Sequence, residues 1–464
     1  MLASSKTHQF NSTVLREYDI RGIVGDTLTE ADAYALGRSY GALAREERAR
    51  RIAVGRDGRT HSGMLEAQLV RGLTDSGLDA VMIGMGPSPM LYFATYQLDV
   101  DGGIQVTGSH NPADYNGFKM LLKGRSIFGQ EIQALGARAA AGDWMQGRGA
   151  VEEVDVRGAY VDRLVEGFTG GEFRIGWDAG NGAAGPILDM LVQRLPGQHF
   201  TIFTDVDGSF PNHHPDPTVE KNLTHLKQLV ADKSLDFGIA FDGDGDRIGA
   251  VDGKGRVIWG DQLMMVLAEA VLRDCPGETI IADVKASQTL FDHVAELGGK
   301  PLMWKTGHSL IKSKMKETGA PLAGEMSGHI FFKHRWYGFD DALYAAVRLI
   351  EAVSQSGRSL TEIKDAMPQT VATPEMRFQV DESRKFAVIE EVLERLFAEG
   401  ADVDSTDGAR VRNADGWWLL RASNTQDVLV GRAEAADESA LRRLLERLDE
   451  QLAQSGVTRV QEAV

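Results

Sequence analysis

Short apolar runs alternate with amphipathic runs along most of this chain, and this alternation constrains its fold more than any other sequence feature. Strand-like runs lie at 51–55, 80–84, 103–106, 173–177, 200–203, 237–241, 279–284 and 302–304, and helix-like runs lie at 63–73, 90–98 and 186–195. Strands that alternate with helices in this way are typical of α/β domains. The pattern therefore predicts an α/β protein.

The length of the chain sets the number of domains. Its 464 residues are too many for one core, and domains of roughly 100 to 200 residues suggest three or four. The pattern divides into blocks at 1–155, 156–258, 259–368 and 369–464. The last block differs from the others, because strand-like runs at 375–380, 417–421 and 428–433 are joined by helix-like runs at 386–397 and 439–452. We expect it to form a smaller α+β domain.

Charge and composition exclude several classes of partner. The net charge of -17 argues against nucleic acid, since binding the phosphate backbone needs a basic surface. An anionic small substrate is still compatible, because basic residues gathered in a cleft act locally. No apolar run approaches the roughly 20 residues of a membrane span, and residues 1–13 lack the apolar segment of a signal peptide. The one cysteine, Cys275, excludes an internal disulfide, so we expect a cytoplasmic protein.

A loop after the run at 103–106 carries a candidate nucleophile. Residues 107–117 read Thr-Gly-Ser-His-Asn-Pro-Ala-Asp-Tyr-Asn-Gly, in which the glycine and proline prevent a helix, so Ser109 is expected on a tight, exposed loop. A serine hydroxyl is a weak nucleophile and needs a base or a metal; His110 and Lys119 are candidate bases. A plain polar turn is the alternative, and these residue types taken alone favour it.

A glycine-rich run in the second block offers a competing function. Residues 180–185 read Gly-Asn-Gly-Ala-Ala-Gly, which satisfies the dinucleotide-binding pattern between a strand and a helix, and Asp205 follows about 20 residues on. The same glycines are equally suited to a tight turn that packs a helix on a sheet. His213 and His214 lie in a proline-rich loop, where incidental histidines are a simpler interpretation than metal ligands.

Three aspartates follow the strand-like run at 237–241. They stand at alternate positions in Asp242-Gly-Asp-Gly-Asp-Arg247, and their charges repel one another too strongly to pack together without a cation. The glycines allow the backbone to curl, so that three oxygens converge on a hard ion such as Mg²⁺. An EF-hand would need glycine and glutamate where Arg247 and Gly253 stand, so the sequence argues against calcium sensing. A solvated acidic turn is the alternative.

The third block contains further candidate contacts. Lys285 and His308 each follow a strand-like run, and open α/β sheets bind ligands beyond the carboxyl ends of their strands. Residues 324–329 read Gly-Glu-Met-Ser-Gly-His, in which Glu325 and Ser327 are suited to binding sugar hydroxyls. A hairpin turn is an equally weighted alternative for this run.

Two polar segments lie near the ends of the chain. Residues 421–426 read Arg-Ala-Ser-Asn-Thr-Gln, and a guanidinium, hydroxyls, an amide and backbone N–H groups together are suited to binding phosphate. The charged segment 16–22 contains Tyr18 and Arg21, and a solvated entry strand is its plain interpretation.

Four of these loops stand in a characteristic order. The runs TGSHNP, DGDGDR, GEMSGH and RASNTQ, about a domain apart, closely resemble the α-D-phosphohexomutase superfamily, and within it the bacterial phosphomannomutase/phosphoglucomutase group. The resemblance implies three related α/β mixed-sheet domains and a smaller α+β C-terminal domain, with one loop of each lining a central cleft. Met326 stands where phosphoglucosamine mutases typically carry a different residue.

The resemblance also implies a role for each matching residue. Ser109 matches the phosphoserine, and Asp242, Asp244 and Asp246 match the magnesium ligands, with a phosphoserine oxygen completing the site. The remaining matches are His110, Lys119, Arg21 and His329 for catalysis, and Tyr18, Arg247, Lys285, His308, Glu325, Ser327, His329, Arg421, Ser423, Asn424 and Thr425 for substrate binding. Lys119, His329 and Arg21 are all candidates for the general acid or base.

The implied reaction is reversible phosphoryl transfer between C1 and C6 of mannose and glucose phosphates. Phosphoserine and a 1,6-bisphosphohexose intermediate carry it, with Mg²⁺ as the metal and glucose 1,6-bisphosphate or mannose 1,6-bisphosphate as activator. We expect hexose phosphates as partners and a monomer, with a dimer as the alternative. An NAD-dependent dehydrogenase using residues 180–185 would leave Ser109 and the aspartates without roles. A catalytically silent sugar-phosphate-binding protein has no feature in its favour.

Overall fold

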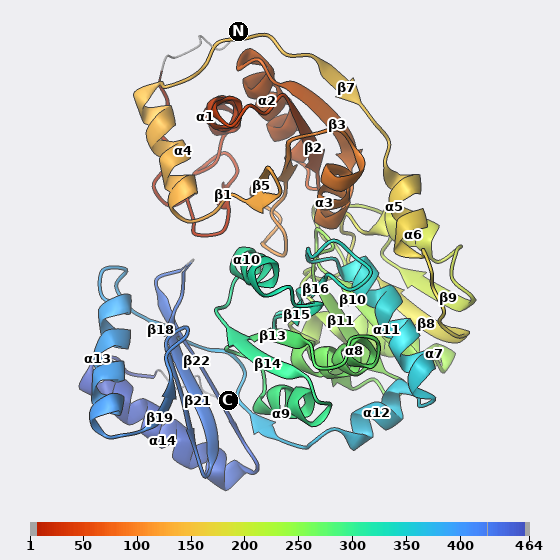
Figure 1. Ribbon diagram of the computed structural model, residues 1–464, viewed down its shortest axis with the longest axis vertical. Helices are drawn as coiled ribbons and strands as arrows, with labels where there is room; N and C mark the ends of the chain where they lie inside the picture. The colour runs from red at the N-terminus through yellow and green to blue at the C-terminus, as the bar shows by residue number, and fades with distance from the viewer. Residues whose placement is uncertain (1–6, 425, 460–464) are drawn as a thin grey trace.

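Four sheets organise the chain, and their order in space follows the sequence (Figure 1). The computed structural model describes residues 7–424 and 426–459. Each sheet belongs to one of the four stretches that the sequence pattern distinguishes, and helices cover the sheets. The predicted α/β class with a distinct C-terminal domain is therefore confirmed, while the exact domain boundaries stay predictions.

Domain I is built on a seven-stranded mixed sheet with the path β1-β5-β4-β2-β3-β7, to which β6 pairs at β5. Its elements are β1 (Ile20–Ile23), α1 (Glu30–Glu46), β2 (Arg51–Arg56), α2 (Ser62–Asp75), β3 (Asp79–Met85), α3 (Ser88–Gln97), β4 (Gly102–Val106), β5 (Tyr115–Leu122), β6 (Arg125–Ser126), α4 (Gln130–Ala141) and β7 (Val151–Glu153). Helices α1, α2 and α4 share one core with the sheet, whereas α3 packs into another. The two faces of the sheet are thus covered by different helices.

Domain II has a five-stranded sheet in the order β12-β11-β10-β8-β9. Its elements are α5 (Arg157–Leu164), β8 (Phe173–Asp178), α6 (Gly185–Leu191), β9 (Gly197–Ile202), η1 (Glu220–Leu223), α7 (Thr224–Lys233), β10 (Phe237–Phe241), β11 (Ile248–Asp252) and β12 (Val257–Ile258). Strands β10 and β11 are antiparallel neighbours, and all their residues are buried. The loop at 242–247, which we call the aspartate loop, therefore joins the ends of two firmly packed strands.

Domain III has a four-stranded sheet in the order β14-β13-β15-β16. Its elements are α8 (Gly260–Asp274), β13 (Thr279–Asp283), α9 (Gln288–Glu296), β14 (Lys300–Trp304), α10 (His308–Thr318), β15 (Leu322–Gly324), β16 (Ile330–Phe332), α11 (Ala342–Ser356) and α12 (Leu360–Ala366). Strands β15 and β16 form an antiparallel pair, so residues 325–329 are a hairpin loop. His308 is the first residue of α10 and is joined to the end of β14 by residues 305–307.

Domain IV is antiparallel and packs against domain III. Its elements are β17 (Val371–Ala372), β18 (Met376–Gln379), α13 (Lys385–Ala398), β19 (Asp402–Asp404), β20 (Ala409–Asn413), β21 (Gly416–Ala422), β22 (Val428–Ala435) and α14 (Glu438–Gln454). The buried guanidinium of Arg410 stacks on Trp417 at 3.9 Å and donates to the carbonyls of Val284 and Ala286 in domain III, at 2.7 and 2.9 Å. These bonds hold the two domains together at the carboxyl end of β13.

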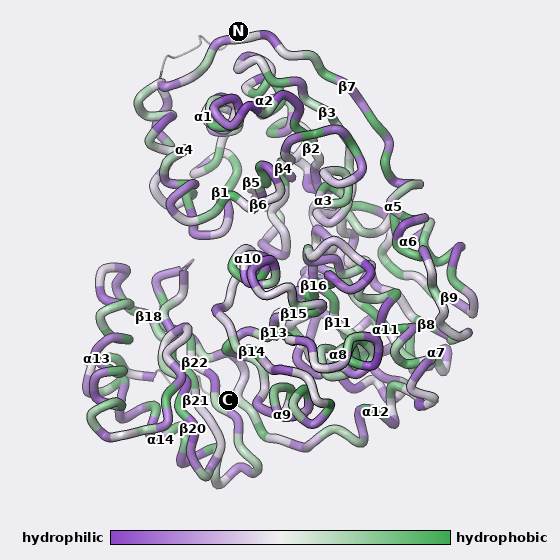
Figure 2. The backbone as a smooth tube through the Cα atoms, in the orientation of Figure 1, coloured by the Kyte–Doolittle hydropathy of each residue, from purple (hydrophilic) through white to green (hydrophobic). Residues whose placement is uncertain are grey.

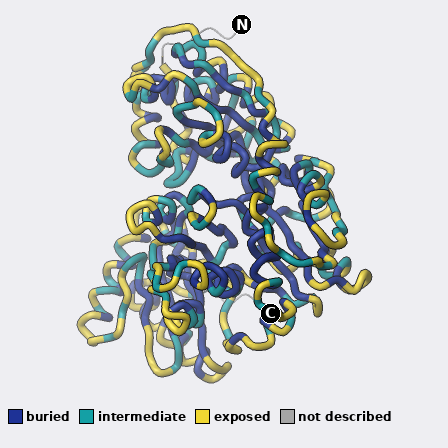
Figure 3. The backbone as a smooth tube through the Cα atoms, turned by 45° about the vertical axis from the view of Figure 1, so that its right-hand side comes forward, coloured by how far each residue is buried: buried dark blue, intermediate teal, exposed yellow. Residues whose placement is uncertain are grey.

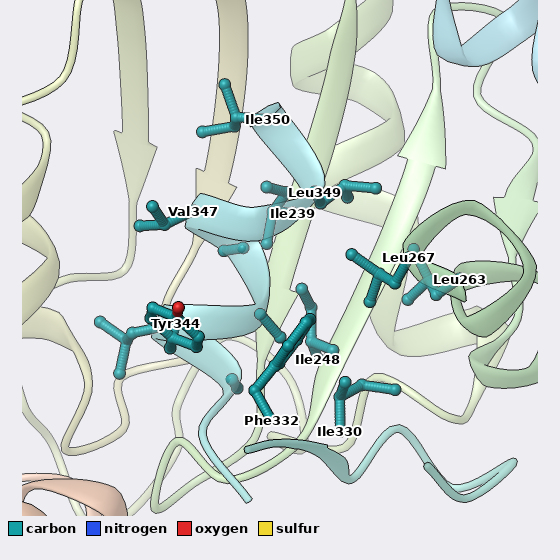
Figure 4. Packing of buried hydrophobic residues seen from close by; sticks show 14 of the residues in the cluster. Ile239, Ile248, Leu263, Leu267, Ile330, Phe332, Tyr344, Val347, Leu349 and Ile350 are labelled. Carbon is teal, nitrogen blue, oxygen red and sulfur yellow. The ribbon is translucent and has the colours of Figure 1, made fainter. Parts of the chain in front are cut away.

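The largest hydrophobic core crosses domain boundaries. It combines α3 of domain I with the sheets and helices of domains II and III. In Figure 4, Ile239 and Ile248 from the domain II sheet lie near Tyr344 and Leu349 of α11, and Ile330 of the domain III hairpin lies close by. Burying each such side chain contributes about 1.5–3 kcal/mol, so domains II and III are joined by their core. The loops that follow the strands of domains II and III are therefore anchored to a shared core.

The sheets are more buried and more hydrophobic than the outer faces of the helices that cover them. The sheets lie inside and the outward faces of helices such as α13 and α14 are exposed (Figure 3). Hydrophobic residues gather along the strands, while hydrophilic residues mark the loops and outer helical turns (Figure 2). Across residues 7–424 and 426–459, no helix combines the length and the apolar character needed to cross a membrane.

Candidate active site

A cavity of about 980 Å³ is lined by residues of all four domains. The predicted residues that line it are Tyr18, Arg21, Ser109, His110, Lys119, Arg247, Lys285, His308, Glu325, Ser327, His329, Arg421, Ser423 and Asn424. Asp242, Asp244 and Asp246 are fully buried next to it. Thr425 lies outside the described residues. The tertiary structure thus brings together residues more than 400 positions apart.

Ser109 lies in the loop between β4 and β5, and its backbone has a φ of +51°, in the sparsely populated left-handed region. The predicted exposed position is wrong, since only 2% of Ser109 is exposed. The aspartate loop of domain II covers it so closely that a Cβ on Gly243 would lie 2.5 Å from the Ser109 carbonyl oxygen. The Ser109 Oγ lies 3.1 Å from His110 Nδ1 and 3.4 Å from Asp242 Oδ2. The hydroxyl therefore faces the aspartates.

The three aspartates form a buried cluster whose oxygen atoms lie within 4.8 Å of one another. Lys119 Nζ lies 2.7 Å from Asp244 Oδ2 and 2.5 Å from Asp246 Oδ2. The Oδ1 atoms of Asp244 and Asp246 are buried, and neither has a hydrogen-bond partner among the described residues. The Lys119 ammonium group therefore bridges two of the three carboxyl groups, and each of these two still carries an unsatisfied oxygen.

The electrostatics of the cluster favour an added cation. Burial, together with the neighbouring carboxylates, raises the pKa of Asp242 well above its ordinary value. Burial would also raise the pKa of Asp244, but Lys119 and the Ser88 hydroxyl outweigh it and lower this pKa. Burial alone would lower the pKa of Lys119, yet the carboxylates raise it well above normal. These oxygen atoms fit a hard divalent cation such as Mg²⁺.

The glycine-rich run at 180–185 supports the aspartate loop. Ala183 N donates to the Gly243 carbonyl at 2.9 Å, and a Cβ on Gly182 would lie 2.8 Å from the same oxygen. None of the described residues from 180 to 185 lines the cavity. The dinucleotide interpretation is therefore not supported, because these glycines permit close packing between two backbones.

The hairpin loop of domain III places a carboxyl group and an imidazole in the cavity. Glu325 is 3% exposed and accepts from Gly307 N at 2.6 Å, and burial raises its pKa. His329 Nε2 accepts from Arg247 Nε at 2.9 Å, and its Nδ1 lies 3.0 Å from Asp340 Oδ2. The sequence left a hairpin turn and a sugar contact as alternatives for residues 324–329. The two are compatible, since the same residues form the hairpin loop and line the cavity.

Domains I, III and IV meet across the cleft. Tyr18 OH donates to the Thr306 carbonyl at 2.8 Å and accepts from Asn424 Nδ2 at 2.6 Å. Arg421 is held by Asp407 at 3.0 Å, and Lys285 lies 3.2 Å from Glu375. Arg21 donates to Asn111 Oδ1 at 2.6 Å and also to Asp19. The cations around the cleft are thus oriented by partners, which suits the binding of an anionic ligand.

Comparisons with known proteins agree with this arrangement. Four family models, described as phosphoglucomutase/phosphomannomutase alpha/beta/alpha domains I, II and III and C-terminal domain, match residues 12–145, 158–255, 259–371 and 375–451.

The chain belongs to the phosphoglucomutase/phosphomannomutase family.

Individual members of this family are similar over nearly their whole length. The chain is 46% identical to phosphomannomutase/phosphoglucomutase of Pseudomonas aeruginosa, with 96% of each chain covered. It is 45% identical to phosphoglucomutase of Neisseria gonorrhoeae, covering 94% of this chain and 95% of the relative. A crystal structure of a family protein from Burkholderia thailandensis superposes with a TM-score of 0.92 at 42% identity, covering 97% of this chain and 98% of that one. The predicted superfamily and four-domain architecture are confirmed.

The sequence analysis missed two residues of this phosphoglucomutase/phosphomannomutase family member, one that lines the cavity and one that contacts a lining residue. Asp216, in the proline-rich loop, lines the cavity, and the flanking Pro215 and Pro217 were a signal that this loop is rigid. Asp340, whose Oδ2 lies 3.0 Å from His329 Nδ1, stands directly before Asp341, the N-cap residue of α11, and so reads as part of a helix start. The histidine of the same loop, His213, binds Asp178 at 3.0 Å and joins no metal-binding group in the described part of the chain.

Proposed function

We propose that this protein interconverts the 1-phosphates and 6-phosphates of glucose and mannose. It is an isomerase of the hexose-phosphate mutase class. The observation that carries the proposal is the position of Ser109 Oγ, 3.4 Å from Asp242, at the point where loops of all four domains line one cavity. A phosphoryl group on this oxygen would lie between the aspartate cluster and the cationic rim.

The aspartate cluster is the proposed magnesium site. Asp242, Asp244 and Asp246, with an oxygen of phosphorylated Ser109, would hold Mg²⁺, whose charge stabilises the charge that builds up on a transferring phosphoryl group. Lys119 bridges two of these carboxylates, and its raised pKa keeps it an ammonium ion. It therefore acts in the proposal as a charge-stabilising donor instead of a base.

His329 is the proposed general base. Arg21 is permanently charged and Lys119 is held as an ammonium ion, so of the three candidates only His329 offers a lone pair. A proton on Nδ1 faces Asp340 at 3.0 Å, which leaves the lone pair on Nε2, where it accepts from Arg247 in this structure. A substrate hydroxyl at this position would give its proton to Nε2.

The reaction then proceeds in two balanced transfers. In the first, the bond between phosphorus and Ser109 Oγ breaks while the free sugar hydroxyl forms its bond to phosphorus and loses its proton to His329. The product is a 1,6-bisphosphohexose, with Ser109 left as its alkoxide and the sugar's proton held on His329. After the sugar turns around in the cavity, the second transfer returns the other phosphoryl group to Ser109, and His329 returns the proton to the sugar oxygen.

Both orientations of the sugar must be bound by the same residues. Glu325 and Ser327 are proposed to contact the 3- and 4-hydroxyls, so the configuration at C2, which distinguishes mannose from glucose, is not read. Arg421, Ser423, Asn424 and Thr425 are proposed to bind the phosphate that is not transferred, with Lys285, His308, Tyr18 and Arg247 as further contacts. The net charge of -17 argues against nucleic acid as a partner. A cytoplasmic location, small-molecule partners and the oligomeric state stay predictions.

The proposed function is tested by measuring whether Ser109 carries a phosphoryl group and whether activity depends on it. We would measure the intact and peptide mass of the protein before and after incubation with glucose 1,6-bisphosphate and Mg²⁺, together with mannose and glucose phosphate mutase assays. One phosphoryl group on Ser109, with activity tracking its occupancy, is the expected result. A Ser109→Ala variant that retains near-normal turnover would contradict the nucleophile, and an unphosphorylated protein without activity would favour the silent binding protein.

A further inference from the structure

A buried arginine outside the proposed catalytic residues donates hydrogen bonds to several carbonyl groups of the Ser109 loop. Arg59 follows β2, and 1% of its side chain is exposed. Its NH2 group donates to the carbonyls of Ser109 at 2.8 Å and Asn111 at 2.6 Å. Its NH1 group donates to the carbonyl of Tyr115 at 3.0 Å and to that of Pro112. One guanidinium thus binds four carbonyl oxygens within seven residues of chain.

We infer that Arg59 is a positioning residue for Ser109. The φ of +51° at Ser109 is sparsely populated for a residue with a Cβ, and such a conformation persists only where its surroundings over-determine it. The bonds from Arg59 to the Ser109 and Asn111 carbonyls fix the peptide group between Ser109 and His110 and the peptide group that follows Asn111. Without them the loop would relax toward a commoner conformation and move the Ser109 hydroxyl away from Asp242.

Asp57 and Gly108 complete this support. Asp57 Oδ2 lies 3.3 Å from Arg59 Nε and accepts from Gly108 N at 3.1 Å, so one carboxylate holds both the arginine and the start of the loop. A Cβ on Gly108 would lie 2.5 Å from the guanidinium carbon of Arg59. The glycine in front of Ser109 is therefore required because the guanidinium lies against its backbone.

Two residues of domain II pack against Arg59. The Arg59 guanidinium carbon lies 5.1 Å from the centroid of the Phe210 ring, which covers it. The backbones are also close, since a Cβ on Gly208 would lie 2.5 Å from the Arg59 Cα. Arg59 is thus held between the Ser109 loop and a loop of the domain that carries the aspartates. Lysine cannot replace it, since an ammonium lacks the planar fork that reaches several carbonyls at once.

The inference rests on the proposed function and is tested by comparing Arg59→Lys with Arg38→Lys. Arg38 is also a buried arginine of domain I that donates to a carbonyl, that of Met145 at 2.8 Å, but it lies away from the cavity. With phosphorylated enzyme, we expect Arg59→Lys to lower kcat at least tenfold with KM within twofold of wild type, and Arg38→Lys to retain kcat. Equal kcat values for Arg59→Lys and wild type would overturn the inference.

Chemical rescue separates positioning from stability. Added guanidinium at millimolar concentration is expected to restore part of the kcat of Arg59→Ala and none of that of Ser109→Ala. If neither Arg59 variant folds, Phe210→Ala decides, because this partly exposed ring can be removed without opening the core. A lowered kcat at unchanged KM supports the inference, and an unchanged kcat contradicts it. An inactive wild-type enzyme would instead refute the proposed function.

Discussion

Arg247 Nε donates to His329 Nε2 at 2.9 Å, and the backbones of these two residues form an isolated antiparallel bridge between domains II and III. The next residue of each, Ile248 and Ile330, enters the same hydrophobic core. The aspartate loop and the hairpin loop at 325–329 are therefore fixed relative to each other by packing that neither domain provides alone. This packing holds His329, the proposed proton acceptor, in place relative to the proposed magnesium ligands.

Replacing His329 by alanine should abolish proton transfer while leaving the fold intact. We expect kcat to fall by about 10²–10⁴-fold, the usual contribution of a general acid or base. Steady-state assays in both directions, with the phosphoserine content measured by mass, provide the test. The matched control is His293→Ala on α9, whose side chain is not among those lining the cavity. Equal losses in the two variants would rule out the assignment.

Replacing Asp244 by asparagine should weaken metal binding. The variant keeps the shape of the side chain but removes one of the buried charges that face Lys119. We expect the Mg²⁺ concentration for half-maximal activity to rise at least tenfold, since hard cations bind carboxylate oxygens more strongly than amide oxygens. Asp365→Asn, at an exposed ion pair with Arg256, is the control. A magnesium titration that superposes on that of wild type would refute the proposed ligand.

Asp341 should make the stability of the protein depend on pH. Burial raises its pKa from 3.8 to about 7, although it accepts from Tyr344 N and from Tyr160 OH. Between these values the folded state binds a proton that the unfolded state has lost, so stability falls as pH rises from about 4 to 7. The full shift corresponds to about 4 kcal/mol.

The measurement compares wild type with Asp341→Asn, which cannot ionise: its amide oxygen can accept from Tyr344 N, and its amide nitrogen can donate to the Tyr160 hydroxyl oxygen. The thermal midpoint of the variant relative to wild type should rise progressively between pH 4 and pH 8. Two parallel pH profiles would show that Asp341 stays ionised in the folded protein.

Adding a methyl group to Gly182 should disturb the aspartate loop. A Cβ there would lie 2.8 Å from the Gly243 carbonyl oxygen, and overpacking of this kind costs about 1–3 kcal/mol. We expect lower activity and weaker Mg²⁺ activation, with no NAD-dependent change in fluorescence in either the variant or wild type. Gly158→Ala, where an added Cβ meets no atom within 4 Å, is the control. Saturable NAD binding that Gly182→Ala abolishes would revive the dehydrogenase interpretation.

Much of the local structure could be predicted from the sequence. The periodicity at 51–55, 237–241 and 279–284 matches β2, β10 and β13, because period and apolar content are properties of neighbouring residues. The aspartate loop could also be recognised, since three carboxylates at alternate positions after a buried strand imply a cation whatever surrounds them. Ends of elements were less certain, as at 186–195, where α6 ends at Leu191.

Contacts between distant segments could not be predicted in the same way. The burial of Ser109 depends on Gly243, the choice of His329 over Lys119 depends on Asp244 and Asp246, and the role of residues 180–185 depends on a backbone more than 50 residues away. Each relationship arises from packing between domains. The sequence by itself determined the elements and the chemistry of each loop, because these follow from nearby residues. Only the tertiary structure decided which groups are buried, paired or free to react, because burial and charge depend on what lies close in space.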